Sequence, residues 1–329
     1  MTTTIKRAYN FNAGPSALPL EVLEVAQKEL LDFQNTGMSV MELSHRSATF
    51  EAVHNGAIEL LRKIYNIPEN YEVLFLQGGA SLQFTMIPMN FLSEGKTASY
   101  VQTGAWSEKA FKEAKFFGTP VEAASTKENK YKNIPSQEDI KFNADDAYVH
   151  ITSNNTIYGT QWKVFPDTGD VPLVADMSSD ILSKPVDVSK FGIIYAGAQK
   201  NLGPSGVTVV IIRKDLLEKA NTNIPTMLKY TTHADNNSLY NTPPTFGIYM
   251  LGEVLKWVEA QGGLEQVAQN NEEKAALIYD VIDASNGFYY GHAEEGSRSL
   301  MNITFRVADE ELEKKFLAEA KEAGFVGLN

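Results

Sequence analysis

Short apolar, β-rich runs alternate with helical or glycine-rich segments along the first 260 residues, and this alternation limits the fold more than any other feature of the sequence. The runs are four to seven residues long and lie at 73–76, 98–102, 147–152, 172–176, 193–196 and 207–213. Strands this short, separated by helices, are typical of a largely parallel sheet that is covered on both faces. The sequence therefore predicts an α/β domain.

Apolar residues at helical spacing complete this pattern. They predict helices at 19–35, 48–65, 82–91 and 245–260. Beyond residue 260 the pattern changes to a helix, then a strand over 300–306, then a charged helix over 309–323. We therefore expect a large domain of residues 16–260 and a smaller α+β domain formed by residues 1–15 together with 261–329.

Composition narrows the classes of function. The 29 basic and 41 acidic residues give a net charge of −12, which disfavours binding to nucleic acid or to an anionic membrane surface. The absence of cysteine excludes disulfides, thiolate metal sites and a cysteine nucleophile. The five histidines show no metal-ligand spacing, so no metal site is expected. With neither a signal-peptide pattern nor an apolar stretch of roughly 20 residues, we expect a cytoplasmic protein.

Polar residues that follow the predicted strands are the first candidates for a site, because ligands of parallel sheets bind beyond the carboxyl ends of the strands. Lys200 stands alone in a glycine-rich loop after one strand, where it could form a Schiff base. The alternative is a surface lysine in a turn. Asp176 ends another strand and could bind the protonated ring nitrogen of a pyridine cofactor. Its alternative is an aspartate that starts a turn.

Two further features follow other strands of the same predicted sheet. Residues 76–81 lead from a strand through glycines into a helix, which is a suitable cradle for an anion, although many ordinary strand-to-helix links look similar. Trp106 is either a core residue or a platform for stacking. A lysine, an aspartate, an anion cradle and an aromatic ring after four strands form the set that pyridoxal phosphate requires.

Several motifs extend this hypothesis to a family. They are YNFNAGPSALP at 9–19, MELSHRS at 41–47, ADMSSDILS at 175–183, YAGAQKNLGP at 195–204 and NTPPTF at 241–246. These motifs occur in this order along essentially the whole chain, and with them the sequence resembles the phosphoserine aminotransferase family. The resemblance implies a fold-type I pyridoxal-phosphate transferase: a mostly parallel, mixed sheet flanked by helices, with a smaller α+β domain. It also implies a homodimer whose active sites lie at the subunit interface.

The resemblance assigns catalytic and ring-binding roles residue by residue. Lys200 would form the Schiff base with the cofactor and move the proton during the reaction. Asp176 would pair with the pyridinium nitrogen, and Trp106 would stack on the ring. Thr156, in NNTIYG at 154–159, would donate a hydrogen bond to the cofactor, at its ring oxygen.

The resemblance also implies a phosphate site. Backbone groups of Ala80 and Ser81, with the side chain of Gln199, would hold the cofactor's phosphate. Asn241 and Thr242 would complete this site from the other subunit.

For the substrate, His45 and Arg46 match the family's anion-binding pair, and the guanidinium fork of Arg46 suits a carboxylate or a phosphate. A surface pair without a ligand is the alternative. The implied reaction transfers an amino group between L-glutamate and 3-phosphohydroxypyruvate, which gives 2-oxoglutarate and L-phosphoserine in serine biosynthesis. Some bacterial relatives also accept 4-phosphohydroxythreonine, which implies a role in pyridoxine biosynthesis.

One departure from the family concerns the end of the sequence. Family members continue beyond a segment like 324–329 into Gly-His-Arg-Ser-Val-Gly-Gly-x-Arg, a strand and a helix, and those arginines bind the substrate. We therefore expect half of the substrate clamp to be missing here, with an incomplete sheet and an uncovered apolar face in the small domain. This leaves two alternative functions: a dimeric shell that binds the cofactor with impaired or no turnover, and an aminotransferase for a non-phosphorylated keto acid.

Overall fold

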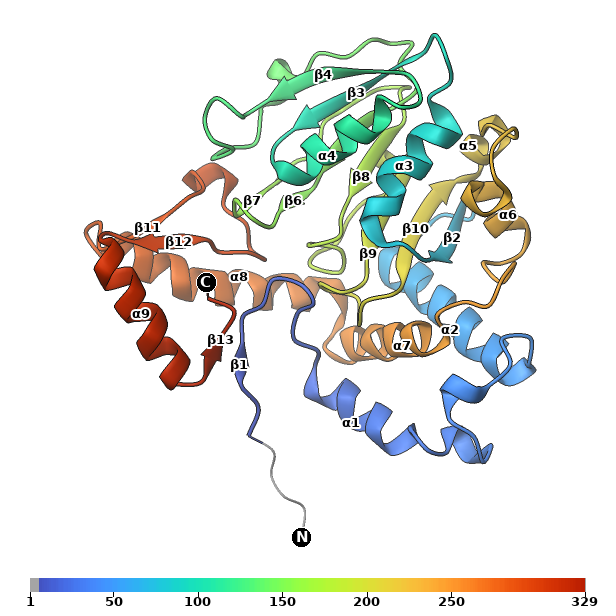
Figure 1. Cartoon of the computed structure of the whole chain (residues 1–329), viewed down its shortest axis with the longest axis horizontal. Helices are drawn as coiled ribbons and strands as arrows, with labels where there is room; N and C mark the ends of the chain where they lie inside the picture. Colours follow the sequence, from blue (N-terminus) through green and yellow to red (C-terminus); the bar gives the residue numbers. More distant parts are fainter. Residues whose placement is uncertain (1–5, 329) are drawn as a thin grey trace.

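A seven-stranded sheet forms the centre of the computed structural model, which describes residues 6–328 (Figure 1). The strand order is β2-β10-β9-β8-β5-β3-β4. Six strands run in one direction, and β10 is antiparallel to both of its neighbours. The strands are β2 (Tyr71–Leu76), β3 (Thr97–Gln102), β4 (Thr119–Ser125), β5 (Val149–Thr152), β8 (Leu173–Asp176), β9 (Ile193–Gly197) and β10 (Thr208–Arg213).

Helices cover both faces of this sheet, which explains why its strands are apolar almost throughout. Alternate residues of β2 enter different cores: Val73 and Phe75 lie in one cluster, and Leu74 and Leu76 in the other. Helices α2 and α7 contribute to the first cluster, and α3 and α4 to the second. The helices of this part are α1 (Leu20–Glu29), α2 (Ala48–Tyr65), α3 (Gly79–Phe91), α4 (Ala105–Ala114), α5 (Lys214–Lys219), α6 (Tyr230–Asp235) and α7 (Thr245–Ala260).

The predicted helix over 19–35 is too long. It ends at Glu29 and is followed by a short 3-10 helix, Phe33–Asn35, in which Gln34 and Asn35 have positive φ. That backbone conformation interrupts an α-helix. The other 3-10 helices are Val40–Glu42, Gln137–Asp139, Val188–Lys190, Thr226–Leu228 and Glu295–Ser297. None of the helices within residues 6–328 is long and apolar enough to cross a membrane.

The C-terminal part begins with the long helix α8 (Gly263–Ala284), which Figure 1 shows running from beneath the large sheet toward β11 and β12. It leads into an antiparallel pair, β11 (Tyr289–Gly291) and β12 (Phe305–Val307), and then into α9 (Glu310–Glu322). Strand β13 (Phe325–Val326) pairs in parallel with β1 (Tyr9–Asn10), so the N-terminal arm joins this part. Of the small domain expected from the sequence, residues 1–5 and 329 lie outside the described residues.

The predicted strand over 300–306 is wrong for most of its length, because β12 begins only at Phe305. The preceding residues instead bond to a hairpin of the large part, formed by β6 (Asn154–Asn155) and β7 (Thr160–Gln161). The N–H of Ser299 donates to the carbonyl of Gly159 at 2.8 Å. Nearby, an apolar groove of about 770 Å³ lies between α8, β12 and α9 and extends to Thr156.

Candidate active site

The carboxyl ends of β2, β3, β5, β8 and β9 lie on one edge of the sheet, and Lys200 follows the last of these strands. Its Nζ donates a hydrogen bond to Thr156 Oγ1 at 2.6 Å and lies 5.8 Å from the centroid of the Trp106 ring. These residues lie on three separate loops or helix ends. The structure therefore brings together three of the side chains singled out from the sequence.

The N-terminal arm packs against the loop that carries Lys200. A Cβ on Gly14 would lie 2.8 Å from Lys200 Cγ, so only glycine fits there without a shift. The N–H of Ser16 donates to the carbonyl of Gln199 at 2.9 Å, and the Ser16 hydroxyl donates to the carbonyl of Lys200. The arm is part of a motif that resembles the family, but the sequence assigned no role to it. Contacts between residues this far apart in sequence cannot be recognised from a local sequence pattern.

Burial lowers the pKa of the Lys200 amine, because a desolvated ammonium is disfavoured. The negative charges of Asp176 and Asp180 act in the opposite direction. A lowered pKa raises the fraction of neutral amine at physiological pH, and the neutral amine is the nucleophilic form.

Asp176 ends β8 and is only 5% exposed. Its Oδ1 accepts hydrogen bonds from the N–H of Ser178 at 2.9 Å and from the Ser178 hydroxyl at 2.6 Å. Desolvation raises the pKa of this carboxyl, while those hydrogen bonds and the charge of Lys200 oppose the rise. Its Oδ2 accepts no hydrogen bond from any described residue, so one oxygen is available to a cationic N–H group.

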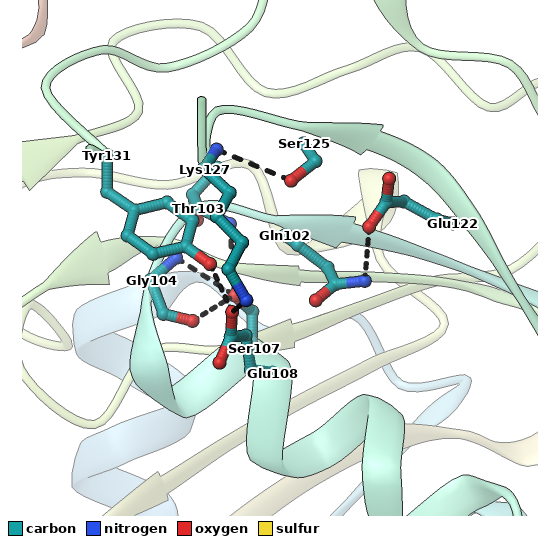
Figure 2. A network of polar contacts seen from close by, with 9 residues as sticks. All are labelled: Gln102, Thr103, Gly104, Ser107, Glu108, Glu122, Ser125, Lys127 and Tyr131. Carbon is teal, nitrogen blue, oxygen red and sulfur yellow. Dashed lines mark hydrogen bonds and ion pairs between the residues drawn. The ribbon is translucent and has the colours of Figure 1, made fainter. Parts of the chain in front are cut away.

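Trp106 lies in the first turn of α4, and a polar network fixes that turn (Figure 2). Ser107 Oγ accepts hydrogen bonds from the N–H groups of Thr103 at 2.9 Å and Gly104 at 3.1 Å. Glu108 accepts from Lys127 Nζ at 2.7 Å and from the hydroxyl of Tyr131. The helix start that holds the indole is thus tied to the loop after β4.

Close packing also joins α4 to the hairpin β6–β7. A Cβ on Gly104 would lie 2.9 Å from Asn155 Oδ1 and 3.0 Å from Tyr158 Cδ2. Thr103 Oγ1 donates to the same Asn155 oxygen at 3.1 Å. Asn155 directly precedes Thr156, so the supports of Trp106 and of Thr156 form one contiguous structure.

The predicted anion cradle lies at the start of α3, where Gly78 has a φ of +90° and the helix begins at Gly79. Ala80 and Ser81 follow in the first turn, whose N–H groups have no partner within the helix. The Gln199 side chain folds over Gly197, since a Cβ there would lie 2.7 Å from Gln199 Oε1.

The remaining predicted residues are not joined to Lys200 within one chain. The Gln77 amide donates to the carbonyl of Thr242 at 3.5 Å, beside Asn241. His45 and Arg46 lie in the turn before α2, where Arg46 Nε donates to His45 Nε2 at 3.3 Å. Across residues 6–328 none of these four side chains forms a hydrogen bond or an ion pair with Lys200, Thr156 or Asp176.

The residues present fit pyridoxal phosphate. A buried carboxylate has a free oxygen, an amine has a lowered pKa, and the first-turn N–H groups of α3 suit a phosphate. The Trp106 Nε1 is buried without a hydrogen-bond partner in the described chain. Such an orphaned donor at an indole edge is satisfied when a polar group binds beside it. No three His, Asp or Glu side chains in the described ranges are grouped to hold a metal ion.

Comparisons with known proteins identify the family of the chain. The family described as Aminotransferase class-V matches residues 8–325. A phosphoserine aminotransferase of Lysinibacillus sphaericus (strain C3-41) is 80% identical over 324 residues, which cover 98% of this chain and 90% of that relative.

Solved structures confirm the fold-type I architecture expected from the sequence. A phosphoserine aminotransferase from Bacillus circulans subsp. alkalophilus is 61% identical, with a TM-score of 0.97, and the match covers 98% of this chain and 90% of that one. A pyridoxal-phosphate-bound phosphoserine aminotransferase from Trichomonas vaginalis is 40% identical, with a TM-score of 0.89 and coverage of 98% and 93%.

Proposed function

The chain belongs to the phosphoserine aminotransferase family, and we propose that it transfers an amino group between L-glutamate and 3-phosphohydroxypyruvate, which gives L-phosphoserine and 2-oxoglutarate. Pyridoxal phosphate is the cofactor, and the reaction belongs to serine biosynthesis. The observation that carries the proposal is the hydrogen-bonded Lys200 beside Trp106, with the buried Asp176 nearby, in a chain that shares most of its residues with phosphoserine aminotransferases.

When bound, the cofactor supplies an electron sink that stabilises negative charge at the substrate's α-carbon. Lys200 would bind it through Nζ and then, released by the substrate, would accept and return the α-proton as a general base and acid. Asp176 would hold a proton on the ring nitrogen through its free Oδ2. Trp106 would fix the plane of the ring, and Thr156 would orient Nζ before the cofactor binds.

Anion binding would be divided among several segments. The first-turn N–H groups at Ala80 and Ser81, with Gln199, would bind the cofactor's phosphate. Because Asn241 and Thr242 do not reach Lys200 within one chain, we infer that they act on the site of a partner subunit. His45 and Arg46 would bind an anionic group of the substrate, for which the exposed guanidinium of Arg46 is suited.

A homodimer is consistent with the exposed apolar side chains of the N-terminal region. These include Leu20 (47% exposed), Leu31 (86%) and Met41 (53%), and exposed large apolar side chains that gather in one region commonly mark an interface. Light scattering would show a mass of twice 36.4 kDa if this inference holds. The division into two domains and the cytoplasmic location remain predictions, which limited proteolysis and cell fractionation would test.

The function is tested by the absorption spectrum of the purified protein with pyridoxal phosphate, before and after L-phosphoserine and L-glutamate are added. We expect a visible cofactor band that both amino donors bleach. The band should be absent in Lys200→Ala and unchanged in Lys214→Ala, a control lysine on the surface.

Other outcomes separate the alternatives. A band that neither donor bleaches would indicate a shell that binds the cofactor without turnover. Bleaching by L-alanine but not by L-phosphoserine would indicate a non-phosphorylated substrate, which the names of the relatives do not favour. The same assay with 4-phosphohydroxythreonine tests the predicted role in pyridoxine biosynthesis.

A further inference from the structure

Asp180 is a second buried carboxylate beside the candidate site, and the mechanism above does not use it. It lies in the turn after β8, four residues beyond Asp176, and is 5% exposed. Its Oδ1 accepts a hydrogen bond from the hydroxyl of Ser153, and its Oδ2 accepts one from Gln161 Nε2 at 3.1 Å. Burying a carboxylate costs folding free energy, so a deeply buried one beside a candidate site is itself a candidate for a functional role.

The two donors lie at the two ends of the hairpin that carries Thr156. Ser153 directly precedes β6, and Gln161 lies in β7, where it pairs with Asn154. One carboxylate therefore ties both ends of the hairpin to the turn that follows Asp176. Because Thr156 accepts the hydrogen bond from Lys200, this tie sets the position of the lysine's partner.

The Gln161 amide has a fixed orientation in this network. Gln161 Oε1 accepts from the N–H of Leu300 at 3.1 Å, so the amide of Gln161 must present Nε2 to Asp180. The single hydroxyl proton of Ser153 lies within reach of two acceptors, Asp180 Oδ1 and the carbonyl of Asp176, the latter at 2.9 Å. An amide at position 180 can accept from Gln161 and donate to Ser153 Oγ, so its main difference from the carboxylate is the loss of charge.

The charge of Asp180 also acts on Lys200. Burial raises the pKa of Asp180 to about 6, although its two hydrogen bonds and the charge of Lys184 favour the anion. Asp176 raises this pKa further by repulsion, and Tyr65 is the other titratable side chain nearby. At pH 8 the anion therefore dominates, and it adds to Asp176 in favouring a protonated Lys200.

We propose that Asp180 is a positioning residue for Lys200: it holds the hairpin so that Thr156 stays against the amine, and its charge helps to retain a proton there. The inference rests on the proposed function for the identity of Lys200 as the reacting amine. It adds the turn after β8 to the parts of the chain that control proton transfer.

Three variants separate this role from simple structural support. Asp180→Asn removes the charge, while its amide can still accept from Gln161 and donate to Ser153 Oγ. The double variant Asp180→Asn/Gln161→Glu returns an anion to the network one side chain away, because the introduced amide donates to the introduced carboxylate, which still accepts from the N–H of Leu300. The matched control is Asp146→Asn, another aspartate with 5% exposure, which lies before β5 and accepts from Ser99 Oγ of β3 at 2.6 Å.

The first readout uses the cofactor-free protein. Acetic anhydride labelling of the peptide containing Lys200, followed by mass spectrometry across pH, gives the pKa of the amine. We expect the pKa of Lys200 to fall by about one unit in Asp180→Asn, because the charge of Asp180 acts on Lys200 and a nearby opposite charge shifts a pKa by this order. In the double variant the pKa of Lys200 should return most of the way to its wild-type value. In Asp146→Asn it should equal the wild-type value.

The second readout is turnover of L-phosphoserine with 2-oxoglutarate. We expect kcat to fall on the order of tenfold in Asp180→Asn with KM little changed, because a displaced reacting group slows chemistry more than binding. An unshifted labelling midpoint with kcat equal to that of Asp146→Asn would overturn the inference. A wild-type protein that lacks a cofactor band would overturn the proposed function instead, while the labelling result would still test Asp180.

Discussion

Carboxylates of the strand-end site and carboxylates of the C-terminal part have pKa shifts of opposite sign. In the site, burial raises the pKa values of Asp176 and Asp180. In the C-terminal part, hydrogen bonds from Arg298 and Arg306 lower those of Asp283 and Glu313. Asp176 and Asp180 are almost fully buried, whereas the Asp283 side chain is 54% exposed.

This difference shows what each region's charges do for the protein. Pairing with arginine stabilises the surface carboxylates only modestly, because solvent screens exposed ion pairs. A buried carboxylate with a raised pKa opposes folding at neutral pH, so its retention points to chemistry rather than to stability. The seven-stranded sheet, with a large core on each face, supplies the stability that such a site requires.

The largest effect is expected for Asp176→Asn, which separates activity from stability. We expect kcat to fall on the order of 100-fold, because one preorganised charge at the reacting group is lost. The free energy of unfolding should not fall, because the amide oxygen keeps the two hydrogen bonds from Ser178 and a desolvated charge is removed. Kinetics and urea unfolding of the same preparation measure both.

Asp283→Asn is the control for that prediction. It removes an exposed carboxylate that accepts from Arg298 and should leave kcat unchanged. A variant at Asp176 that keeps full activity but unfolds more easily would reverse the assignment of roles to the two regions.

Much of the large sheet and its site could be predicted from the sequence. The local hydrophobic pattern predicts the helices and strands, and the common direction of the strands predicts which of their ends meet. The helices at 48–65 and 245–260 have the predicted bounds, since their apolar periodicity is strong. The convergence of Lys200, Asp176 and the start of α3 follows from the rule that parallel strands end on one edge. The assignment of cofactor roles to these residues stays a prediction.

What could not be predicted depends on contacts between distant segments. Leu300, Met301 and Ile303 look like a strand in sequence, yet the β11–β12 pairing begins only at Phe305. The N–H of Leu300 donates instead to Gln161 Oε1 in β7, and that of Met301 donates to Ser299 Oγ. Asp180 gives no signal either, because its donors Ser153 and Gln161 are brought to it only by the fold. Hydrophobic periodicity carries no information on such polar contacts.

The next largest effect concerns pH and follows from the raised pKa of Asp180. Its folded pKa of about 6 exceeds the ordinary value of 3.8, so the folded state binds more protons between these pH values. The contribution of this group to the free energy of unfolding therefore falls as pH rises from about 4 to above 6, by at most about 3 kcal/mol. Urea unfolding of wild type and Asp180→Asn across this range isolates the difference.

Asp283 should show the opposite sign when the same experiment is extended below pH 4, with Asp283→Asn as the reference variant. Its folded pKa is lowered, so its favourable contribution is present above the ordinary pKa and is lost as pH falls. Parallel pH profiles for wild type and Asp180→Asn would contradict the contrast between the two regions.

Gly159→Ala tests the junction between the regions. Gly159 has a φ of +66°, and a Cβ there would lie 2.7 Å from Thr304 Oγ1 and 2.9 Å from the carbonyl of Asn302. We expect the free energy of unfolding to fall by about 2 kcal/mol from backbone strain and overpacking. Gly169→Ala is the control, because its φ of +56° gives similar strain with nothing within 4 Å of the added Cβ.

Gly159→Ala should lose more free energy of unfolding than Gly169→Ala, and this difference measures the contact between the hairpin β6–β7 and the C-terminal part. If that contact matters for the site, kcat/KM falls while the cofactor band persists. Equal losses in the two variants, with unchanged kinetics, would show that the site does not depend on the C-terminal part.

The smallest effect is expected for Tyr131→Phe, which removes the hydroxyl that donates to Glu108 in the first turn of α4 (Figure 2). Glu108 keeps its ion pair with Lys127, so the free energy of unfolding should fall by only about 1.5 kcal/mol, the usual value for a hydrogen bond to a charged group. Because this bond fixes the first turn of α4, the Trp106 fluorescence should change as well. Tyr290→Phe, at a side chain that is 50% exposed, should alter neither quantity. A loss of stability without any change in Trp106 fluorescence would mean that Ser107 alone fixes the turn, and the support of the site would then be independent of the loop after β4.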